Sequence, residues 1–323
     1  MKPPPFVYHR PGSVGEAVRA LADAGENGKV LAGGQSLVPV LNMRLAAPGH
    51  LVDINQLGQE LAFLETDHET VRVGALVRHA QTARDGAHTV ALPLLAQATA
   101  HVAHQTIRNR GTTVGSIVHA DPAGELPAVL LLCEGEVTLA SVAGTRTVAA
   151  ADFFVGPLES ALRPGELALS ATFRIPQGHT GSTWVEVSRR AGDYALCGLG
   201  LIVTLDGDLR LARARAGYIS VGPTPLLIDL TDAVAGQPHD GADWAAAGAL
   251  AAAMVDPDDD IHATADYRRH LVRVLTERAG RAAVAHALSR PANVHDAMDG
   301  FLAQTSHNNQ TSHDKQTSHN RES

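Results

Sequence analysis

The first residues that could do chemistry form a run of small side chains near the N-terminus of the 323-residue chain. In order, they are Ala32, Gly33, Gly34, Gln35, Ser36 and Leu37. The run joins an apolar segment typical of a buried strand to an apolar-periodic segment typical of a helix. Glycines at such a junction let backbone N–H groups come close to a phosphate, and the N-terminus of a helix favours negative charge. Taken alone, the two glycines favour a plain turn, because the run matches neither a Walker loop nor the G-x-G-x-x-G pattern.

A second run of small and hydroxyl-bearing residues follows a predicted helix further along the chain. It contains Thr112, Thr113, Val114, Gly115 and Ser116. Two such loops in adjacent subdomains could hold one diphosphate from both sides, which would suit a dinucleotide with an extended diphosphate. The alternative is that the two runs are unrelated turns.

Three folding units would position these loops, and together they predict an α+β protein. Residues 1–55 alternate between short strands and helices, and residues 57–177 form a second unit of mixed strands and helices. In the first unit, Ser13 and Glu16 have the spacing of a capping box, which predicts the start of a helix. Residues 178–290 predict an antiparallel meander followed by alanine-rich helices.

The last predicted helix and the segment that follows it differ in composition. On the helix, Tyr267, Leu271, Val274 and Arg278 are expected to share one face. Residues 291–323 repeat the sequence QTSH and hold few apolar side chains. We expect this tail to be disordered, because it cannot offset the entropy that ordering costs. Its histidines could bind a metal weakly, but a solvated tail is the favoured interpretation.

The charge and cysteine content of the chain exclude several classes of protein. The formal net charge is −8 and no basic stripe is present, which argues against nucleic-acid binding. No apolar run reaches the ~18 residues of a membrane span. The N-terminus lacks the apolar core of a secretory signal, so the cytoplasm is the expected compartment. Cys133 and Cys197 are too far apart for a CxxC-type site, so any iron–sulfur cluster would have to belong to another chain.

Two further polar clusters do not match metal sites. His101 and His104 lie three residues apart on a predicted helix, but the H-E-x-x-H order of a zinc site is missing. The acidic run at residues 256–260 lacks the glycine and the final glutamate of an EF-hand loop. We interpret the acidic run as a solvated segment that leads into a helix.

Four segments in the same order resemble the FAD-binding medium subunit of the xanthine dehydrogenase and aerobic carbon monoxide dehydrogenase family of molybdenum hydroxylases. They are AGGQSLVPVLNMRLA at 32–46, IRNRGTTVGSIVHADPAGELP at 107–127, RRAGDYAL at 189–196 and DDIHATADYRRHLVRVLTERA at 259–279. The resemblance extends over residues 1–288. It implies a PCMH-type FAD-binding domain over residues 1–177, like that of vanillyl-alcohol oxidase. It also implies a carbon monoxide dehydrogenase flavoprotein C-terminal domain over residues 178–290.

The resemblance implies that both loops hold the pyrophosphate of FAD. In the second loop the family pattern is T-I-G-G followed by Asn or Asp, whereas this chain has Val114 in place of a glycine and Ser116 in place of the last residue. Valine does not readily adopt a positive φ, so either this position has ordinary dihedral angles or the loop shifts. In the first loop Gln35 replaces the histidine that is common in the carbon monoxide enzymes, which argues against carbon monoxide as the substrate.

Four further FAD contacts follow from the resemblance. Asp121 would support the second loop, and Glu125 would accept hydrogen bonds from ribose or ribityl hydroxyl groups, unless it is only an acidic residue at a helix N-terminus. Tyr194 would lie near the flavin, where its ring could stack, unless it packs in the sheet core. Leu167 would pack against the flavin.

The resemblance implies an electron-transfer function without a catalytic acid or base. The chain would pass electrons from two [2Fe-2S] clusters on an iron–sulfur small subunit, through FAD, to an external acceptor. A molybdopterin large subunit would hold the molybdenum cofactor and oxidise the substrate, in a heterotrimer or a dimer of heterotrimers. Two alternatives stay open: a stand-alone flavin oxidase of the vanillyl-alcohol type, and an assembly subunit that has lost the cofactor.

Overall fold

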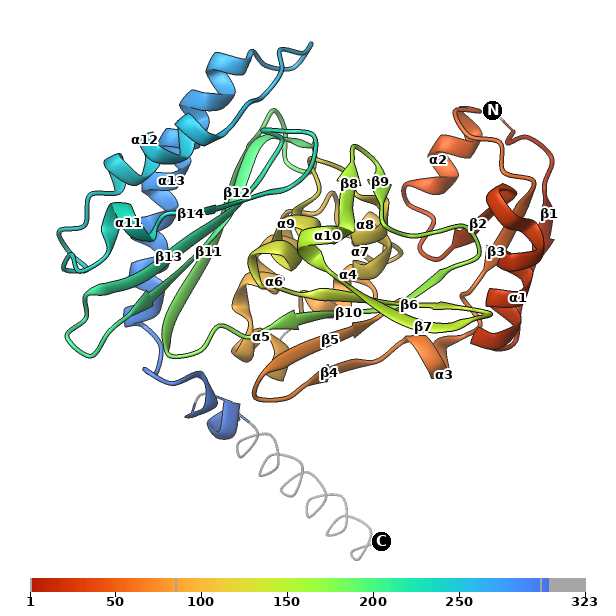
Figure 1. Ribbon diagram of the computed structural model, residues 1–323, viewed down its shortest axis with the longest axis horizontal. Helices are drawn as coiled ribbons and strands as arrows, with labels where there is room; N and C mark the ends of the chain where they lie inside the picture. The colour runs from red at the N-terminus through yellow and green to blue at the C-terminus, as the bar shows by residue number, and fades with distance from the viewer. Residues whose placement is uncertain (1, 85, 297, 302–323) are drawn as a thin grey trace, which may run out of the picture.

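A computed structural model describes residues 2–84, 86–296 and 298–301 of the chain (Figure 1). Three main sheets follow one another along the sequence, and each has helices packed against it. Among the described residues, no helix combines the length and the apolar composition that a membrane crossing requires. The QTSH repeats lie outside the described residues.

The N-terminal sheet has three parallel strands and positions the first loop. Its strands, in their order across the sheet, are β1 (Val7–His9), β3 (His50–Asp53) and β2 (Gly28–Leu31). Its helical connections are α1 (Val14–Ala24), η1 (Gly25–Asn27) and α2 (Leu37–Asn42). The predicted capping box is half formed: the Ser13 hydroxyl accepts the Glu16 N–H at 3.2 Å, but the Glu16 carboxylate accepts the N–H of Gly12 rather than that of Ser13.

The second sheet is antiparallel and has five strands. In their order across the sheet they are β4 (Leu64–Thr66), β5 (Thr70–Gly74), β10 (Leu167–Arg174), β6 (Glu136–Ser141) and β7 (Gly144–Ala149). A separate hairpin consists of β8 (Phe154–Gly156) and β9 (Glu159–Ser160). The helices of this unit are α3 (Gly58–Leu61), α4 (His79–Thr82), α5 (Ala87–Ala91), α6 (Pro93–His101), α7 (Gln105–Arg108), α8 (Thr113–His119), α9 (Glu125–Leu132) and α10 (Ala150–Phe153).

The third sheet is the predicted antiparallel meander. Its strands are adjacent in chain order: β11 (His179–Ser188), β12 (Ala195–Leu205), β13 (Leu211–Ile219) and β14 (Leu226–Asp229). The helices that follow are α11 (Thr231–Val234), α12 (Trp244–Met254) and α13 (Ala265–Leu288). Helices α12 and α13 lie together beside the sheet, and α13 packs on β11 and β12 (Figure 1).

Helix α9 joins the second and third units. It is apolar on all sides, as expected for a helix without a solvent-facing side. It contacts β12, β13 and β14 of the third sheet as well as α6 and α8 of its own unit. The hydrophobic cluster around it therefore includes Trp184 and Ile202 from the third sheet, whereas a second cluster fills the space between that sheet and α12 and α13.

The chain returns to the second unit after α13. Val294 and Met298 are buried, with 3% and 2% of their surface exposed, in the same cluster as α9. Arg290 donates a hydrogen bond to the carbonyl oxygen of Val90 at 2.7 Å. Part of the segment that we assigned to a disordered tail from residue 291 therefore packs on the folded chain.

Candidate functional site

The first predicted loop touches the residues that lie directly before the second. A β-carbon on Gly33 would lie 2.5 Å from the carbonyl oxygen of Arg110 and 2.7 Å from the Cα of Gly111, so the two backbones meet where no side chain fits. Gly33 lies in the connection between β2 and α2, and Arg110 and Gly111 lie directly before α8. The structure therefore brings together two runs of small residues that are far apart in the sequence.

The first loop presents unpaired backbone donors. Gly34 has a φ of 71°, in the left-handed region that favours glycine. Its carbonyl oxygen accepts the N–H of Val38 at 3.0 Å, and the Gln35 side chain donates to the carbonyl oxygen of Gly33 at 3.1 Å. Within the described chain, no hydrogen bond uses the backbone N–H groups of residues 33–37, all of which are partly exposed. Successive free N–H groups of this kind form a concave donor set suited to an anion.

The second loop is built from buried residues that support two accessible ones. The Thr112 hydroxyl oxygen accepts the N–H of Gly115 at 3.1 Å and so caps α8. Thr113 and Val114 are buried, whereas Gly115 is exposed and Ser116 is partly exposed. This loop begins a helix, which the glycine- and proline-rich sequence did not predict.

Val114 fits the loop without strain. It lies inside α8 and is not among the residues with a positive φ. Its side chain is 2% exposed and belongs to the core around α9. Of the two possibilities raised by this departure from the family pattern, ordinary dihedral angles are the one observed.

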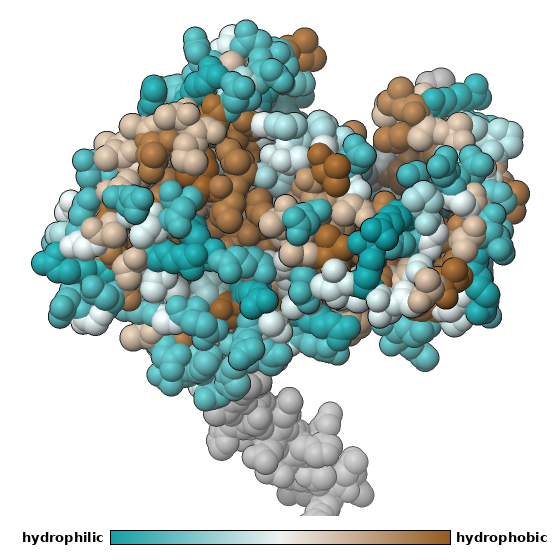
Figure 2. Space-filling view, in the orientation of Figure 1, coloured by the Kyte–Doolittle hydropathy of each residue, from teal (hydrophilic) through white to brown (hydrophobic). Residues whose placement is uncertain are grey.

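The surface is hollowed beside these loops. Figure 2 shows a notch between α2 and the β8–β9 hairpin, with apolar side chains on both sides. The exposed apolar side chains on these two elements include Val38 and Met43 on the side of α2 and Val155 and Leu158 on the hairpin. The N–H of Leu158 donates to the carbonyl oxygen of Ala120 at 3.0 Å, which ties the hairpin to the end of α8. The notch thus has polar loops at α2 and α8 and apolar walls.

Asp121, Glu125 and Tyr194 form a second group. Burial, followed by the negative charge of Glu186, raises the pKa of Glu125 to about 8, although Glu125 is the first residue of α9 and a helix N-terminus favours a carboxylate. The pKa of Tyr194 is raised by desolvation of its hydroxyl group and by the charges of Asp121 and Glu125. Tyr194 as a whole is 70% exposed, so it does not pack in the sheet core.

Glu186 and His101 complete this group, and sequence patterns did not point to the pair. His101 Nδ1 lies 3.3 Å from Glu186 Oε1, and the Trp184 indole N–H donates to Glu186 Oε2 at 3.0 Å. Only 7% of the Glu186 side chain is exposed, and its hydrogen bond raises the pKa of His101. His101 thus pairs with a carboxylate of the third sheet.

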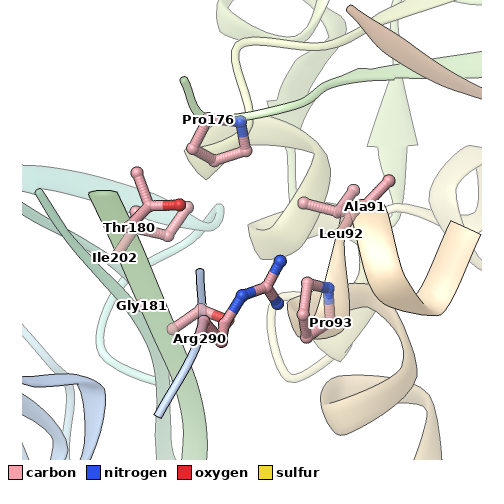
Figure 3. Close-up of a pocket in the computed structure, with 9 residues that line it drawn as sticks. Ala91, Leu92, Pro93, Pro176, Thr180, Gly181, Ile202 and Arg290 are labelled. Carbon is pink, nitrogen blue, oxygen red and sulfur yellow. The ribbon is translucent and has the colours of Figure 1, made fainter. Parts of the chain in front are cut away.

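Two other features lie apart from these loops. Leu167 is 1% exposed in β10 and packs inside the core, so the structure does not bring its side chain to the notch. A small pocket lies where β11 faces α6, and Arg290 reaches between Pro93 and Gly181 there (Figure 3). None of the predicted FAD contacts lines this pocket.

Matches to known families extend over most of the chain. The family described as the FAD binding domain in molybdopterin dehydrogenase matches residues 4–178. The family described as the CO dehydrogenase flavoprotein C-terminal domain matches residues 182–283. The two families follow each other in the order that the sequence segments predicted.

Known proteins resemble the chain over nearly their whole length. It is 40% identical over 308 residues to the 6-hydroxypseudooxynicotine dehydrogenase complex subunit alpha of Paenarthrobacter nicotinovorans, covering 93% of this chain and 100% of that protein. This chain is also 34% identical over 286 residues to the carbon monoxide dehydrogenase medium chain of Hydrogenophaga pseudoflava, and the match covers 88% of this chain and 98% of that protein.

Solved structures confirm the predicted fold class. Carbon monoxide dehydrogenase from Hydrogenophaga pseudoflava superposes with a TM-score of 0.83 at 33% identity, over 88% of this chain and 99% of that chain. Quinoline 2-oxidoreductase from Pseudomonas putida 86 also superposes with a TM-score of 0.83, at 34% identity, over 89% of this chain and 100% of that chain. The chain therefore belongs to the FAD-binding medium subunits of the xanthine dehydrogenase and carbon monoxide dehydrogenase family of molybdenum hydroxylases.

Proposed function

We propose that the chain holds the diphosphate of FAD between residues 32–37 and residues 112–116, and that it transfers electrons from a partner's iron–sulfur clusters to an external acceptor. The observation that carries this proposal is the contact between the two loops, in which Gly33 lies against Arg110 and the N–H groups of residues 33–37 remain unpaired. When bound, FAD supplies the chemistry of accepting and releasing electrons, while the protein supplies binding and orientation.

The donor set fits a diphosphate. The free N–H groups lie at the start of α2, and the hydroxyl group of Ser36, which makes no capping hydrogen bond, adds a donor. In the second loop, the accessible residues are Gly115 and Ser116. The buried residues that support this part of the loop are Thr112, Thr113 and Val114.

The group around Tyr194 fits the remainder of the cofactor. The exposed ring offers a face on which a flavin can stack. Glu125, protonated at neutral pH because its pKa is about 8, can both donate to and accept from a sugar or ribityl hydroxyl group. Asp121 accepts the N–H of Ala123 at 2.9 Å and supports the turn between α8 and α9. Leu167 is not part of the proposed site.

The partners follow from the relatives, several of which are named as medium chains or as subunits of a complex. We propose that this chain assembles with an iron–sulfur small subunit that carries two [2Fe-2S] clusters and with a molybdopterin large subunit. The assembly would be a heterotrimer or a dimer of heterotrimers in the cytoplasm. We further propose that residues 1–177 form the FAD-binding domain and residues 178–290 the C-terminal domain, a division supported by the family matches at 4–178 and 182–283.

The test is to isolate the complex through an affinity tag on this chain and to follow electron flow in it. We expect two further subunits, molybdenum, iron and one FAD per copy of this chain. After anaerobic mixing with reductant, the cluster absorbance should bleach before or together with the flavin absorbance at about 450 nm. A chain that purifies alone, binds FAD and oxidises an alcohol by itself would instead support the stand-alone oxidase.

A further inference from the structure

Arg78 is hydrogen-bonded directly to Arg110, before the second loop, and through Asn55 to the first loop. Its Nη1 donates to the carbonyl oxygen of Arg110 at 2.6 Å, and its Nη2 donates to Asn55 Oδ1 at 2.7 Å. Asn55 Nδ2 in turn donates to the carbonyl oxygen of Ala32 at 2.8 Å. One guanidinium group and one amide therefore link the start of the first loop to the residue that precedes Gly111 in the second.

Both ends of this bridge are held in place. Residues 77–79 run beside residues 111–113: the N–H of His79 donates to the carbonyl oxygen of Gly111 at 3.0 Å, and the N–H of Thr113 donates to that of Val77 at 3.1 Å. At the other end, Asp53 Oδ1 accepts the N–H of Asn55 at 2.9 Å and its Nδ2 at 2.6 Å. The bridge thus spans from the three-stranded sheet to the second unit through fixed groups.

The geometry of the bridge needs an arginine. A guanidinium group presents rigid, diverging donors, whereas an ammonium group is a single point on a flexible chain. The acceptors of Arg78 are a carbonyl and an amide oxygen, and in the described residues it forms no ion pair. Desolvation and the neighbouring Arg110 lower its pKa, so its position costs free energy that its two hydrogen bonds must offset.

We propose that Arg78, with Asn55, is a positioning residue that sets the spacing of the two FAD loops. This inference rests on the proposed function of those loops. Arg78 binds the carbonyl oxygen of Arg110 and Asn55 binds that of Ala32, so neither side chain uses the N–H groups of residues 33–37. Arg78 therefore affects FAD binding through the loops. The affinity for FAD depends on the two hydrogen bonds of its guanidinium group and not on its charge alone.

The test compares Arg78→Leu, Arg78→Lys and Asn55→Ala with the wild-type chain after FAD removal. We expect Arg78→Leu and Asn55→Ala to weaken FAD binding about 10- to 100-fold, since each removes hydrogen bonds to a rigid polar network. Arg78→Lys keeps the charge and should not restore wild-type affinity. Arg72→Leu is the matched control, because Arg72 lies in the same unit, is exposed, and contacts Glu65 at 3.2 Å and the ring of Phe63 rather than either loop. The FAD affinity of this variant should equal that of the wild type.

Amide hydrogen exchange of the FAD-free proteins supplies a readout that does not depend on cofactor binding. We expect faster exchange of the hydrogen-bonded amides of Val38 and Val40, next to the first loop, and of residues 110–116 for Arg78→Leu and Asn55→Ala, and no change there for Arg72→Leu. Unchanged exchange in both segments, or wild-type affinity in Arg78→Lys, would overturn the inference while leaving the FAD site in place. If the wild-type chain takes up no FAD, the proposed function fails, and the exchange comparison still decides whether the bridge orders the loops. Should Arg78→Leu fail to fold, Asn55→Ala breaks the same bridge from the other side.

Discussion

The Cα of Gly33 faces the carbonyl group of Arg110 so closely that a β-carbon would stand 2.5 Å from its oxygen. The neighbour in this contact is backbone, which cannot rotate away as a side chain can. The contact joins two loops from different folding units, and the free N–H groups of the first loop begin at this point. It is the observation behind our proposal that the two loops form one diphosphate site rather than two separate turns.

Gly33→Ala should separate the loops. Relieving the overlap requires a backbone shift that costs about 1–3 kcal/mol, so we expect FAD affinity to fall at least about tenfold. Fluorescence titration of the FAD-free chain measures this. Gly58→Ala is the control, since a β-carbon at Gly58 would meet no atom within 4 Å. Equal affinity of the Gly33→Ala and Gly58→Ala variants would show that the contact does not shape the site.

Glu125→Gln should change how stability depends on pH. The pKa of Glu125 is about 8 in the folded chain, against 4.5 for an unperturbed glutamate side chain, so between these values the folded chain holds a proton that the unfolded chain releases. Stability therefore falls as pH rises through this window. The variant should lack this loss and should be more stable than the wild type at pH 9 by on the order of 1 kcal/mol or more. Urea denaturation at pH 5, 7 and 9 is the measurement, and parallel curves for the two proteins would contradict the assignment.

The same substitution should leave FAD binding at pH 7 within about threefold of the wild type, because the amide resembles the protonated acid in shape and hydrogen bonding. Glu125→Ala is the comparison and should bind more weakly. A large loss of affinity in Glu125→Gln at pH 7 would indicate that the carboxylate form is the one that contacts the cofactor.

Glu186→Gln should lower the pKa of His101. The hydrogen bond with Glu186 is the largest cause of the raised value, and burial acts in the opposite direction. The His101–Glu186 pair stabilises the folded chain fully at pH values below 6.5, the pKa of His101 in the unfolded chain. This stabilisation is lost as the pH rises through the higher pKa of His101 in the folded chain. NMR titration of the His101 ring measures the shift, with the exposed His104 as an internal control. A His101 titration midpoint unaffected by Glu186→Gln would exclude the pairing in solution.

Tyr194→Ala should weaken FAD binding and alter the visible circular dichroism of the bound flavin, whereas Tyr194→Phe should preserve both. A stacked aromatic pair contributes about 0.5–1.5 kcal/mol, which corresponds to roughly 2- to 13-fold in affinity. The ring is exposed in the FAD-free chain, so its removal should leave the unfolding midpoint nearly unchanged. Identical spectra for Tyr194→Ala and the wild type would place the flavin elsewhere.

Sequence patterns predicted much of the fold because the relevant signals are local. The meander of β11 to β14 follows from alternating strands and turn residues, and the apolar run at residues 126–132 lies in the buried helix α9. Tyr267, Leu271, Val274 and Arg278 lie on one helix as predicted, but the buried positions of α13 include Arg268, Leu271, Val272 and Leu275, whereas Tyr267 is 44% exposed. An arginine is not expected inside, and only the fold brings the carbonyl oxygens of Leu196 and Ser220 to it.

The aspartates of the acidic run before α13 are exposed, as the sequence predicted, but one of them also anchors the chain. Asp260 accepts the N–H groups of His262 and Ala263 and pairs with Arg268 at 2.6 Å. These contacts, the backbone hydrogen bonds foremost, lower its pKa to about 2. A run of aspartates carries no local signal that distinguishes one such anchor from its exposed neighbours.

Of the site, the two loops were predictable from their small residues, but the groups that hold them together were not. Arg78 and Asn55 are ordinary polar residues in the sequence, and their role depends on pairing between segments 77–79 and 111–113. Glu186 and His101 meet across the boundary between the second and third units. Contacts of this kind come from tertiary packing, which periodicity and spacing do not encode.

The most direct test of the account is the FAD content of the purified chain, measured by absorbance and by release of the cofactor on denaturation. The account predicts one FAD per chain, retained on gel filtration by the wild type and by Gly58→Ala and lost by Gly33→Ala. A colourless wild-type protein that takes up no FAD when the cofactor is added would contradict it.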